Sequence, residues 1–457
     1  MNITNGALLQ ASTNQGDWKK SGQLVYALSS HNIGIIGSGT LDGAGLVFYT
    51  NGPSKNASTV SGNHLIHTIQ FQNCSNITMT GFHVQNSTEQ TIVLDQCDQV
   101  LVDGVTVTNR AREFGSGDDG IDFNNCRYVT ANNLSIETGD DGICIKTQGD
   151  AWLNPPRLTS HDILIQNCTV ASTCQATKIG TATQNEVYNL TFTNITINRH
   201  SYIVSIYNPI PTGECEAAIN LEMCDGGNNH DITCTHYIIN RCYSSVYMVI
   251  ENRTVGFGTQ SNITISDILC TNSLAASQIN VQPGGQFQNL TFSNIVVHNF
   301  ETNTTTSSPP YQDNGYPYGY QIGGNIVHMP AYGLFARYVN GLQFNGIISF
   351  FDEGHSGRPA IAFENCSNIS TNPAIVSQGN LRISIFTLDA AKTHAWLQGT
   401  GGTPGVTYYV LSSSNLVLLP ANWTSVATNS FLFDGSFSVT NSLIGQCPQQ
   451  FYRLKTY

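Results

Sequence analysis

Residues 115–147 read GSGDDGIDFNNCRYVTANNLSIETGDDGICIKT, and this stretch decides the fold. The tetrapeptide Gly-Asp-Asp-Gly occurs in it twice, at positions 117–120 and 139–142. Each copy leads into a short alternating apolar run, Ile-Asp-Phe at 121–123 and Ile-Cys-Ile at 143–145, which ends at a polar turn. A period of about 22 residues with one short strand in each period is typical of a solenoid, in which every repeat forms one coil that stacks on the next.

Stacked coils would bring four carboxylates together. Asp140 and Asp141 would lie directly above Asp118 and Asp119, at one strand spacing of roughly 4.8 Å. Carboxylates this close raise one another's pKa and destabilise the coils that carry them, which indicates a role other than folding. A calcium site or a solvated acidic turn explains a single Asp-Asp pair, but two copies at coil spacing favour catalysis. Glycoside hydrolysis needs such a set, because one carboxylic acid protonates the leaving group while other carboxylates activate water.

The composition excludes several classes of function. Only 11% of the 457 residues are charged, and 18 Lys and Arg stand against 30 Asp and Glu, for a formal charge of −12. Nucleic-acid binding is excluded, because a phosphate ligand requires basic patches. The sequence has no run of 18 apolar residues, so we expect no membrane contact. No cysteine pair has the Cys-x-x-Cys spacing of a zinc site, so we expect no metal. We also expect no cofactor. The protein should be a monomer whose partner is a polysaccharide.

The thirteen cysteines are an odd number, and most of them follow Asn or Gln at one position of the repeat. This recurring position predicts an interior stack of thiols that behave as small apolar side chains. Cys215 and Cys224 lie close together in what reads as a polar loop, and they are the best candidates for a disulfide. The members of the predicted stack are Cys74, Cys97, Cys126 and Cys168.

The rest of the chain predicts an all-β protein. From residue 69 onwards, strands of three to five β-branched or aromatic residues alternate with Asn, Gly and Ser, which indicates a right-handed parallel β-helix over residues 1–378. The many Asn-x-Ser/Thr sequons read as turn-plus-strand tripeptides, so we infer no glycosylation from them. In residues 379–457 the turn signals recur every eight to twelve residues, which predicts a small C-terminal β-sandwich that serves as an accessory domain.

Two long interruptions of the period contain prolines and aromatic residues, at residues 149–160 and 302–324. Loops of this length on a solenoid commonly form the walls of a binding groove. We expect them to do so here.

Both ends of the sequence bear on where the protein works. The coil pattern is already present at Asn2, and neither the charged nor the apolar part of a signal peptide precedes it. We therefore expect that an upstream segment has been lost or removed, and that residues 1–20 supply no amphipathic helix or other cap. The Phe-Tyr-Arg-Leu close at 451–454 resembles the short modules that end many secreted bacterial proteins. A secreted or periplasmic protein of bacterial origin is the prediction.

The acidic turns, the Gly-Ser-Gly-Thr-Leu-Asp-Gly segment at 37–43 and the Asn-Cys-x-Asn-Ile coils together resemble glycoside hydrolase family 28, the polygalacturonases. The family's Asn-Thr-Asp-Gly-Ile-Asp motif corresponds to residues 117–122, and its Gly-Asp-Asp motif to 139–141. The resemblance implies that the anomeric configuration is inverted, with carboxylates far enough apart to admit a water molecule. It also implies the roles of the acidic residues: Asp140 is the general acid, Asp119 and Asp141 hold and deprotonate the water, and Asp118 contacts the substrate.

Two family motifs are absent. Gln175 stands where the family has the histidine of Gly-His-Gly, and residues 204–207, Val-Ser-Ile-Tyr, stand where Arg-Ile-Lys binds the galacturonate carboxylate. Whether another basic residue replaces the lost contact stays open at this point. The nearby basic residues are Lys146, Lys178, Arg110, Arg112 and Arg199, and the predicted substrate contacts are Asp118, Gln175, Lys178, Lys146, Arg199 and Tyr207.

Three functions compete. The first is an inverting glycoside hydrolase that cleaves a pectic or related plant or microbial polysaccharide, and the acidic repeats favour it. The second is a non-catalytic glycan-binding β-helix that kept its carboxylates after losing the histidine, which would bind sugar without releasing reducing ends. The third is a polysaccharide lyase, which would depend on a calcium-bridged uronate and a strong base.

Overall fold

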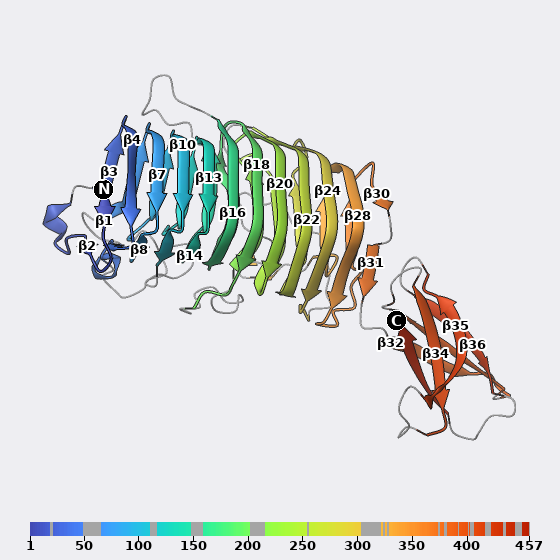
Figure 1. Ribbon diagram of the computed structural model, residues 1–457. Coiled ribbons are helices and arrows are strands. Elements are labelled where there is room, and N and C mark those ends of the chain that lie inside the picture. Colours follow the sequence, from blue (N-terminus) through green and yellow to red (C-terminus); the bar gives the residue numbers. More distant parts are fainter. Residues whose placement is uncertain are drawn as a thin grey trace.

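The computed structural model describes residues 1–18, 22–48, 65–109, 117–147, 159–201, 215–253, 256–302, 321–322, 325–326, 329–372, 375–378, 382–391, 393–400, 402, 406–415, 422–432, 436–443 and 450–456. Most of these residues belong to one 29-stranded sheet whose strands all pair in parallel and wind into stacked coils (Figure 1). This confirms the predicted parallel β-helix.

Each strand pairs with the strand one coil later, so the coils form ladders along the solenoid. What we call the site ladder consists of β3 (Gly22–Leu28), β6 (Leu65–Gln72), β9 (Ile92–Asp95), β12 (Ile121–Asn124), β15 (Ile143–Thr147), β17 (Gln175–Thr183), β19 (Cys215–Met223), β21 (Cys242–Ile250), β23 (Ser277–Val281), β27 (Leu334–Arg337) and β29 (Ile361–Glu364).

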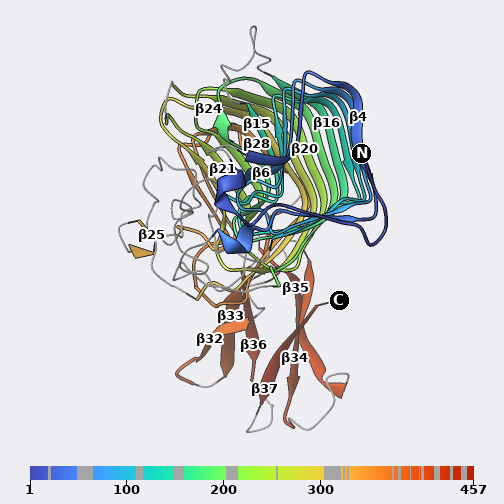
Figure 2. The ribbon, with the colours of Figure 1, turned by 90° about the vertical axis from the view of Figure 1, so that its left-hand side faces the viewer.

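A second ladder lies on another side of the coil, as β4, β16 and β20 show in Figure 2. It consists of β1 (Asn2–Ile3), β4 (His31–Gly37), β7 (Ser75–Thr80), β10 (Asp98–Asp103), β13 (Arg127–Asn132), β16 (Ser160–Ser172), β18 (Val187–Ile197), β20 (Asn228–Ile239), β22 (Thr259–Ser273), β24 (Gln286–Asn299), β28 (Val339–Asp352), β30 (Ser370–Asn372) and β31 (Ile375–Gln378). A shorter ladder of β2 (Leu8–Gln10), β5 (Thr40–Asp42), β8 (His83–Gln85), β11 (Thr106–Thr108) and β14 (Ser135–Thr138) joins it at β16.

Aliphatic side chains stacked in register hold the coils together. Ile69, Ile92, Ile121 and Ile143 face one another across successive strands, and none is more than 1% exposed. Side chains alternate in direction along a strand. On each of these strands the residue next to the isoleucine therefore points to the outer face of the site ladder. The functional side chains described below lie there and in the turns before the strands.

Asparagines occupy many of the corners between strands. Asn76, Asn167 and Asn194 have φ angles of 51°, 57° and 55°, a left-handed conformation that asparagine tolerates because its side chain bonds locally. These residues begin Asn-x-Thr sequons, and each lies directly at a turn into or within a strand, as the turn-plus-strand interpretation requires. Their amides form ladders of their own, in which Asn76 donates to Asn32 (2.5 Å), Asn194 to Asn167 (2.6 Å) and Asn289 to Asn262 (3.1 Å).

The cysteine prediction was partly wrong. Cys74, Cys97 and Cys126 are buried and in register, as expected. Cys168 is buried but lies elsewhere, opposite Ile195. Ser160 follows Cys126 in the stack, because one long coil rather than two regular repeats comes after Cys126.

The predicted Cys215–Cys224 disulfide was also wrong. Both thiols are free, and so are the other cysteines in the described part of the chain. Cys215 begins β19 and Cys224 directly follows its end, so an extended strand of roughly 30 Å separates them. All nine residues of β19 are buried, which shows that this segment is a strand and not a polar loop.

Residues 1–18 contribute β1, β2 and one turn of 3-10 helix, η1 (Gln15–Asp17), that has no buried residue. Trp18 packs against Ala11, Ala44 and Leu24. No amphipathic α-helix occurs in these eighteen residues. A second such turn is η2 (Gly45–Val47). Among the described residues, no helix has the length and apolar character that crossing a membrane requires.

The C-terminal strands form two small antiparallel sheets, separate from the parallel sheet in both views (Figure 1, Figure 2). Ala395 and Leu397 of one sheet pack against Tyr408 and Val410 of the other, which confirms the predicted small β-sandwich. The first sheet contains β32 (Arg382–Leu388), β33 (His394–Thr400) and β36 (Phe437–Ser442), the second contains β35 (Thr424–Ser430), β34 (Thr407–Ser413) and β37 (Phe451–Thr456), and β25 (Gln321–Ile322) pairs with β26 (Asn325–Ile326) before them.

Candidate active site

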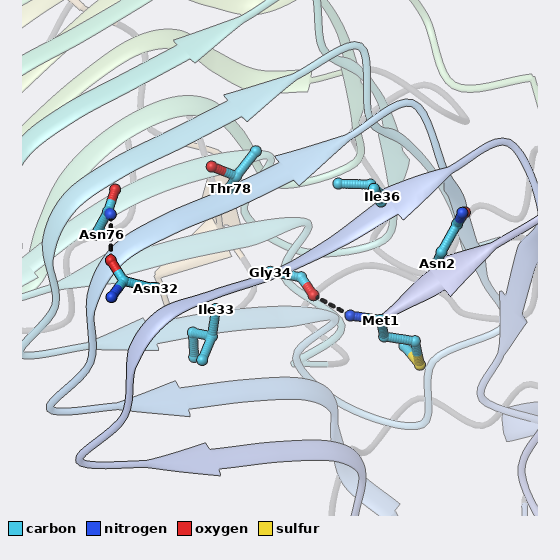
Figure 3. Close-up of a pocket in the computed structure, with 8 residues that line it drawn as sticks. All are labelled: Met1, Asn2, Asn32, Ile33, Gly34, Ile36, Asn76 and Thr78. Carbon is cyan, nitrogen blue, oxygen red and sulfur yellow. Dashed lines mark hydrogen bonds between the residues drawn. The ribbon is translucent and has the colours of Figure 1, made fainter.

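A shallow hollow at the N-terminal end of the solenoid is not the candidate site (Figure 3). The amino group of Met1 is bound there to the carbonyl oxygen of Gly34 at 2.7 Å. No acidic or basic side chain lines the hollow, so it has no side chain that could transfer a proton. Its lining residues are Met1, Asn2, Asn32, Ile33, Gly34, Ile36, Asn76 and Thr78.

The two Gly-Asp-Asp-Gly turns lie on successive coils and lead directly into β12 and β15. Ile121 pairs with Ile143, and the backbone N–H of Gly120 donates to the carbonyl oxygen of Asp141 at 2.8 Å. The predicted stacking of the two acidic pairs is therefore confirmed.

The glycines that end these turns are needed because the coils approach closely. A Cβ on Gly142 would lie 2.4 Å from Val170 Cγ1 and 2.5 Å from the carbonyl oxygen of Ala176. We expect Gly142→Ala to destabilise the protein by about 1–3 kcal/mol, because a backbone oxygen cannot move aside. Thermal denaturation measures this, with Gly16→Ala as control, since a Cβ there meets nothing closer than 3.4 Å. An unchanged melting temperature for Gly142→Ala would contradict the close packing.

Lys146 binds the first acidic turn. Its Nζ lies 2.8 Å from Asp119 Oδ2 and 2.7 Å from Asp122 Oδ1, and all three side chains are buried. Gln90 also donates to Asp119 Oδ2, at 3.3 Å. Burial raises the pKa of Asp119, but Lys146 and then Lys178 outweigh it and hold that pKa below its usual value.

Lys178 binds the second acidic turn in the same way. Its Nζ lies 3.0 Å from Asp141 Oδ2 and 3.7 Å from Glu222 Oε2, and Lys178, Asp141 and Glu222 are all buried. Glu222 accepts further hydrogen bonds from Thr181 Oγ1 at 2.8 Å and Asn220 Nδ2 at 3.0 Å. The other oxygen of Asp141, Oδ1, is buried and has no hydrogen-bond partner among the residues the structure describes.

Asp140 has a different environment. Its side chain is partly exposed, and it accepts hydrogen bonds from the backbone N–H groups of Gly117 at 2.7 Å and Asp141 at 2.9 Å. No lysine or arginine of the described ranges forms an ion pair with it. Desolvation and the charges of Asp119 and Asp141 raise the pKa of Asp140 to about 8. The cluster therefore contains Asp140, a carboxyl group that is mostly protonated near neutral pH and has no cation partner among the described residues, beside carboxyl groups that bind lysines.

Asp118 and Gln175 are both buried. Asp118 is fully buried, and its Oδ2 accepts from the backbone N–H of Gly139 at 3.2 Å, so the structure gives it a contact within the turn. Gln175, at the position of the family histidine, is 1% exposed and donates through Nε2 to Glu216 Oε2 at 2.5 Å. An amide that cannot titrate thus takes the place of an imidazole.

The remaining predicted residues do not lie in the cluster as described. Arg199 is exposed and lies just beyond the end of β18. Tyr207, Arg110 and Arg112 fall outside the described residues, as does most of the two interruptions that we expect to form groove walls.

Sequence reasoning missed three titratable residues around the cluster. Asp122 binds Lys146, and Glu222 binds Lys178. In the sequence each of these two acidic residues stands directly between apolar residues. Burial raises the pKa of Asp122 well above its usual value, and the charge of Asp119 adds to this. His67 on β6 lies near enough to Asp119 and Lys146 to feel both charges, and burial lowers its pKa to about 4, so it is neutral.

One group of side chains brings potential metal ligands together. Asp140, Asp141 and Cys174 offer ligand atoms within 4.8 Å of one another. Burial raises the pKa of the Cys174 thiol well above its usual value, so it stays protonated. A neutral thiol is a poor ligand, since the thiolate is the form that binds metals.

Comparison with known proteins places this site in a family. A polygalacturonase of Malus domestica is 25% identical over 137 residues, and polygalacturonase-2 of Solanum lycopersicum is 26% identical over 144. These matches span 30% of this chain and 29% of either plant protein. The crystal structure of a hyperthermoactive exopolygalacturonase from Thermotoga maritima shares the fold, with a TM-score of 0.50 and 18% identity over 65% of this chain and 75% of that one.

The family model for glycosyl hydrolases family 28 matches residues 2–310, which is more than half of the chain and includes both acidic turns. The chain belongs to glycosyl hydrolases family 28.

Proposed function

We propose that the protein is an inverting glycoside hydrolase that cleaves a glycosidic bond of a polysaccharide. The observation that carries this proposal is the division of the cluster into one carboxyl group without a cation, Asp140, and two carboxylates that each bind a lysine, Asp119 and Asp141. Groups whose environments drive their pKa values apart are the usual sign of an acid and a base in one site. Family membership supports the same conclusion.

In the proposed reaction, protonated Asp140 donates its proton to the glycosidic oxygen as the bond from that oxygen to the anomeric carbon breaks. A water molecule attacks the anomeric carbon from the opposite face, and its proton passes to Asp119 or Asp141. Asp119 and Asp141 are assigned this task because a lysine holds each of these carboxylates in place. Inversion follows from a single displacement.

The lysines also bear on the substrate. Lys146 and Lys178, the basic residues closest to the cluster in the described ranges, are each already bound by two carboxylates. Neither is available as a dedicated partner for a uronate carboxylate. We therefore propose that the sugar in the cleaved subsite is neutral, or that its carboxylate is placed away from the cluster.

The test is a panel of polysaccharides screened for release of reducing ends. The panel contains neutral plant and microbial glycans and pectic glycans of high and low methyl esterification, and the anomer released first is determined by NMR. We expect release from at least one glycan with inverted configuration. Sugar binding in a calorimeter without release would instead favour a glycan-binding β-helix. Calcium-dependent products that absorb as unsaturated uronates would favour a lyase.

A further inference from the structure

We propose that Lys146 and Lys178 are positioning residues for this reaction: each bridges one water-activating carboxylate to a second carboxyl group behind it and so holds the side chains of Asp119 and Asp141 in place. This inference rests on the proposed function. It goes beyond the family assignment because it names the residues that hold the two carboxylates in place.

The same arrangement occurs twice, one coil apart. Lys146 at the end of β15 reaches back one coil to Asp119 and to Asp122 of β12. Lys178 on β17 reaches back one coil to Asp141 and forward to Glu222 of β19. In both cases the lysine belongs to the coil that follows its carboxylate, so each coil fixes the acidic turn before it.

The fold itself does not require these charges. In the row of the site ladder that contains Asp122, the neighbouring coils carry Val93 and Cys144, and opposite Glu222 the next coil carries Val249. An apolar side chain therefore fits these rows. Replacing a buried ion pair by apolar packing is often neutral or stabilising, so a network retained only for stability would be a poor one.

The network also leaves unsatisfied atoms, which a stabilising device would not. Asp122 Oδ2 is buried without a hydrogen-bond partner in the described ranges, and Asp141 Oδ1 is in the same condition. Leaving such an atom unpaired costs about 1–3 kcal/mol.

The two lysines act mainly on different sides of the pH profile, because Lys178 lowers the pKa of Asp119 less than Lys146 does. Lys146 is the strongest influence that lowers the pKa of Asp119, whereas Lys178 is the strongest that lowers the pKa of Asp140. Losing Lys146 therefore raises the pH at which the water-activating carboxylate ionises, and losing Lys178 raises the pH at which the acid loses its proton. The charged or titratable groups around these two carboxyls are Asp119, Asp122, Asp140, Asp141, Lys146, Lys178, His67 and Cys174.

The experiment measures kcat and KM against pH for Lys146→Met and Lys178→Met, with a glycan that the wild-type protein cleaves. We expect kcat to fall by about 100-fold or more in both, since general acid and base catalysis contributes about 10²–10⁴-fold. KM should change little, because both lysines are buried and bound by carboxyl groups. The acidic limb of the profile should move to higher pH in Lys146→Met, and the alkaline limb should move to higher pH in Lys178→Met.

Arg253→Met is the matched control. Arg253 binds buried Asp225 through two contacts, of 3.0 and 2.5 Å, in a pair to which neither acidic turn contributes. We expect this variant to lose thermal stability but to keep the wild-type kcat and both limbs of the profile. If the lysine variants behave like Arg253→Met, losing stability with normal kinetics, the proposal fails.

A second pair of variants guards against loss of folding. Lys146→Gln and Lys178→Gln remove the charge but keep a hydrogen-bond donor, and they should show the same shifts of the two limbs. If these variants also do not fold, the lysines serve stability and the proposal is wrong. Failure of the proposed function would look different, because then Asp140→Asn would retain activity or no glycan would be cleaved at all.

Discussion

Replacing Asp140 with asparagine is expected to reduce hydrolysis by about 100-fold or more, which is what loss of a general acid typically costs. Asparagine has nearly the same shape and its single side-chain oxygen can still accept one of the two backbone hydrogen bonds, from Gly117 or from Asp141, so the turn should persist. Initial rates of reducing-end release at saturating glycan measure the effect. Asp103→Asn, which changes a carboxylate at a distant corner that binds Asn132 and Asn133, should leave the rate unchanged.

The same variant should be as stable as the wild type or more stable. Because the pKa of Asp140 in the folded protein is about 8, folding holds a proton that the unfolded chain releases above its ordinary carboxyl pKa of about 4. Between those two values the ionisation of Asp140 opposes folding increasingly as the pH rises. The asparagine of the variant does not ionise, so the melting temperature should stay within a few degrees or rise near pH 7.

Residual activity above about a tenth of the wild-type rate would show that another group is the acid.

Activity on unesterified polygalacturonate is expected to be low or absent. This polymer carries one carboxylate on each sugar, and the two cationic residues that bind it in the family are replaced at residues 204–207 by Val-Ser-Ile-Tyr. Losing two charge-assisted contacts of about 1.5–3 kcal/mol each weakens the reactive subsite by about 3–6 kcal/mol, a factor of hundreds or more. Lys146 and Lys178 cannot make up the loss while they are bound by carboxylates.

The matched comparison is between fully methyl-esterified and de-esterified polymer of the same length, which differ in charge and little else. Any activity on pectic chains should favour the esterified form. Turnover of the de-esterified polymer with kcat/KM of about 10⁴ M⁻¹s⁻¹ or more would contradict this expectation. It would imply that the exposed Arg199, or a residue outside the described ranges, binds the carboxylate.

The sequence predicted the acidic turns well because a single regular coil separates them. That one period is enough to place the turn of Asp119 against the turn of Asp141 without any knowledge of the loops. The alternation of Ile121 and Phe123 likewise showed which side chains enter the core. The position of the acidic cluster could therefore be predicted from residues 115–147, and the β-helix from these residues together with the strand repeats from residue 69 onwards.

The partners of those carboxylates could not be predicted in the same way. Ile121 pairs with Ile143, Ile143 with Thr177 and Thr177 with Ile219, so the second of these three coils is longer than the first, and the third is longer again. Spacing no longer tells which residue of the next coil faces Asp141, and Glu222 was missed for this reason. The wrong assignments of Cys168 and of the Cys215–Cys224 pair have a related origin, since the positions of strands beyond residue 147 do not follow from the regular period.

The asparagine ladders have a consequence for how the protein is produced. Asn76, Asn194 and Asn289 are acceptor sites for N-linked glycans by sequence, yet each uses its side-chain amide to bind the asparagine of the coil before it. A glycan is attached to that same nitrogen. In a eukaryotic secretory host the sugar would be added before the coils close, and its bulk would then stand between strands only about 4.8 Å apart. We expect a host without N-glycosylation to yield more folded protein than a yeast or insect secretion system does.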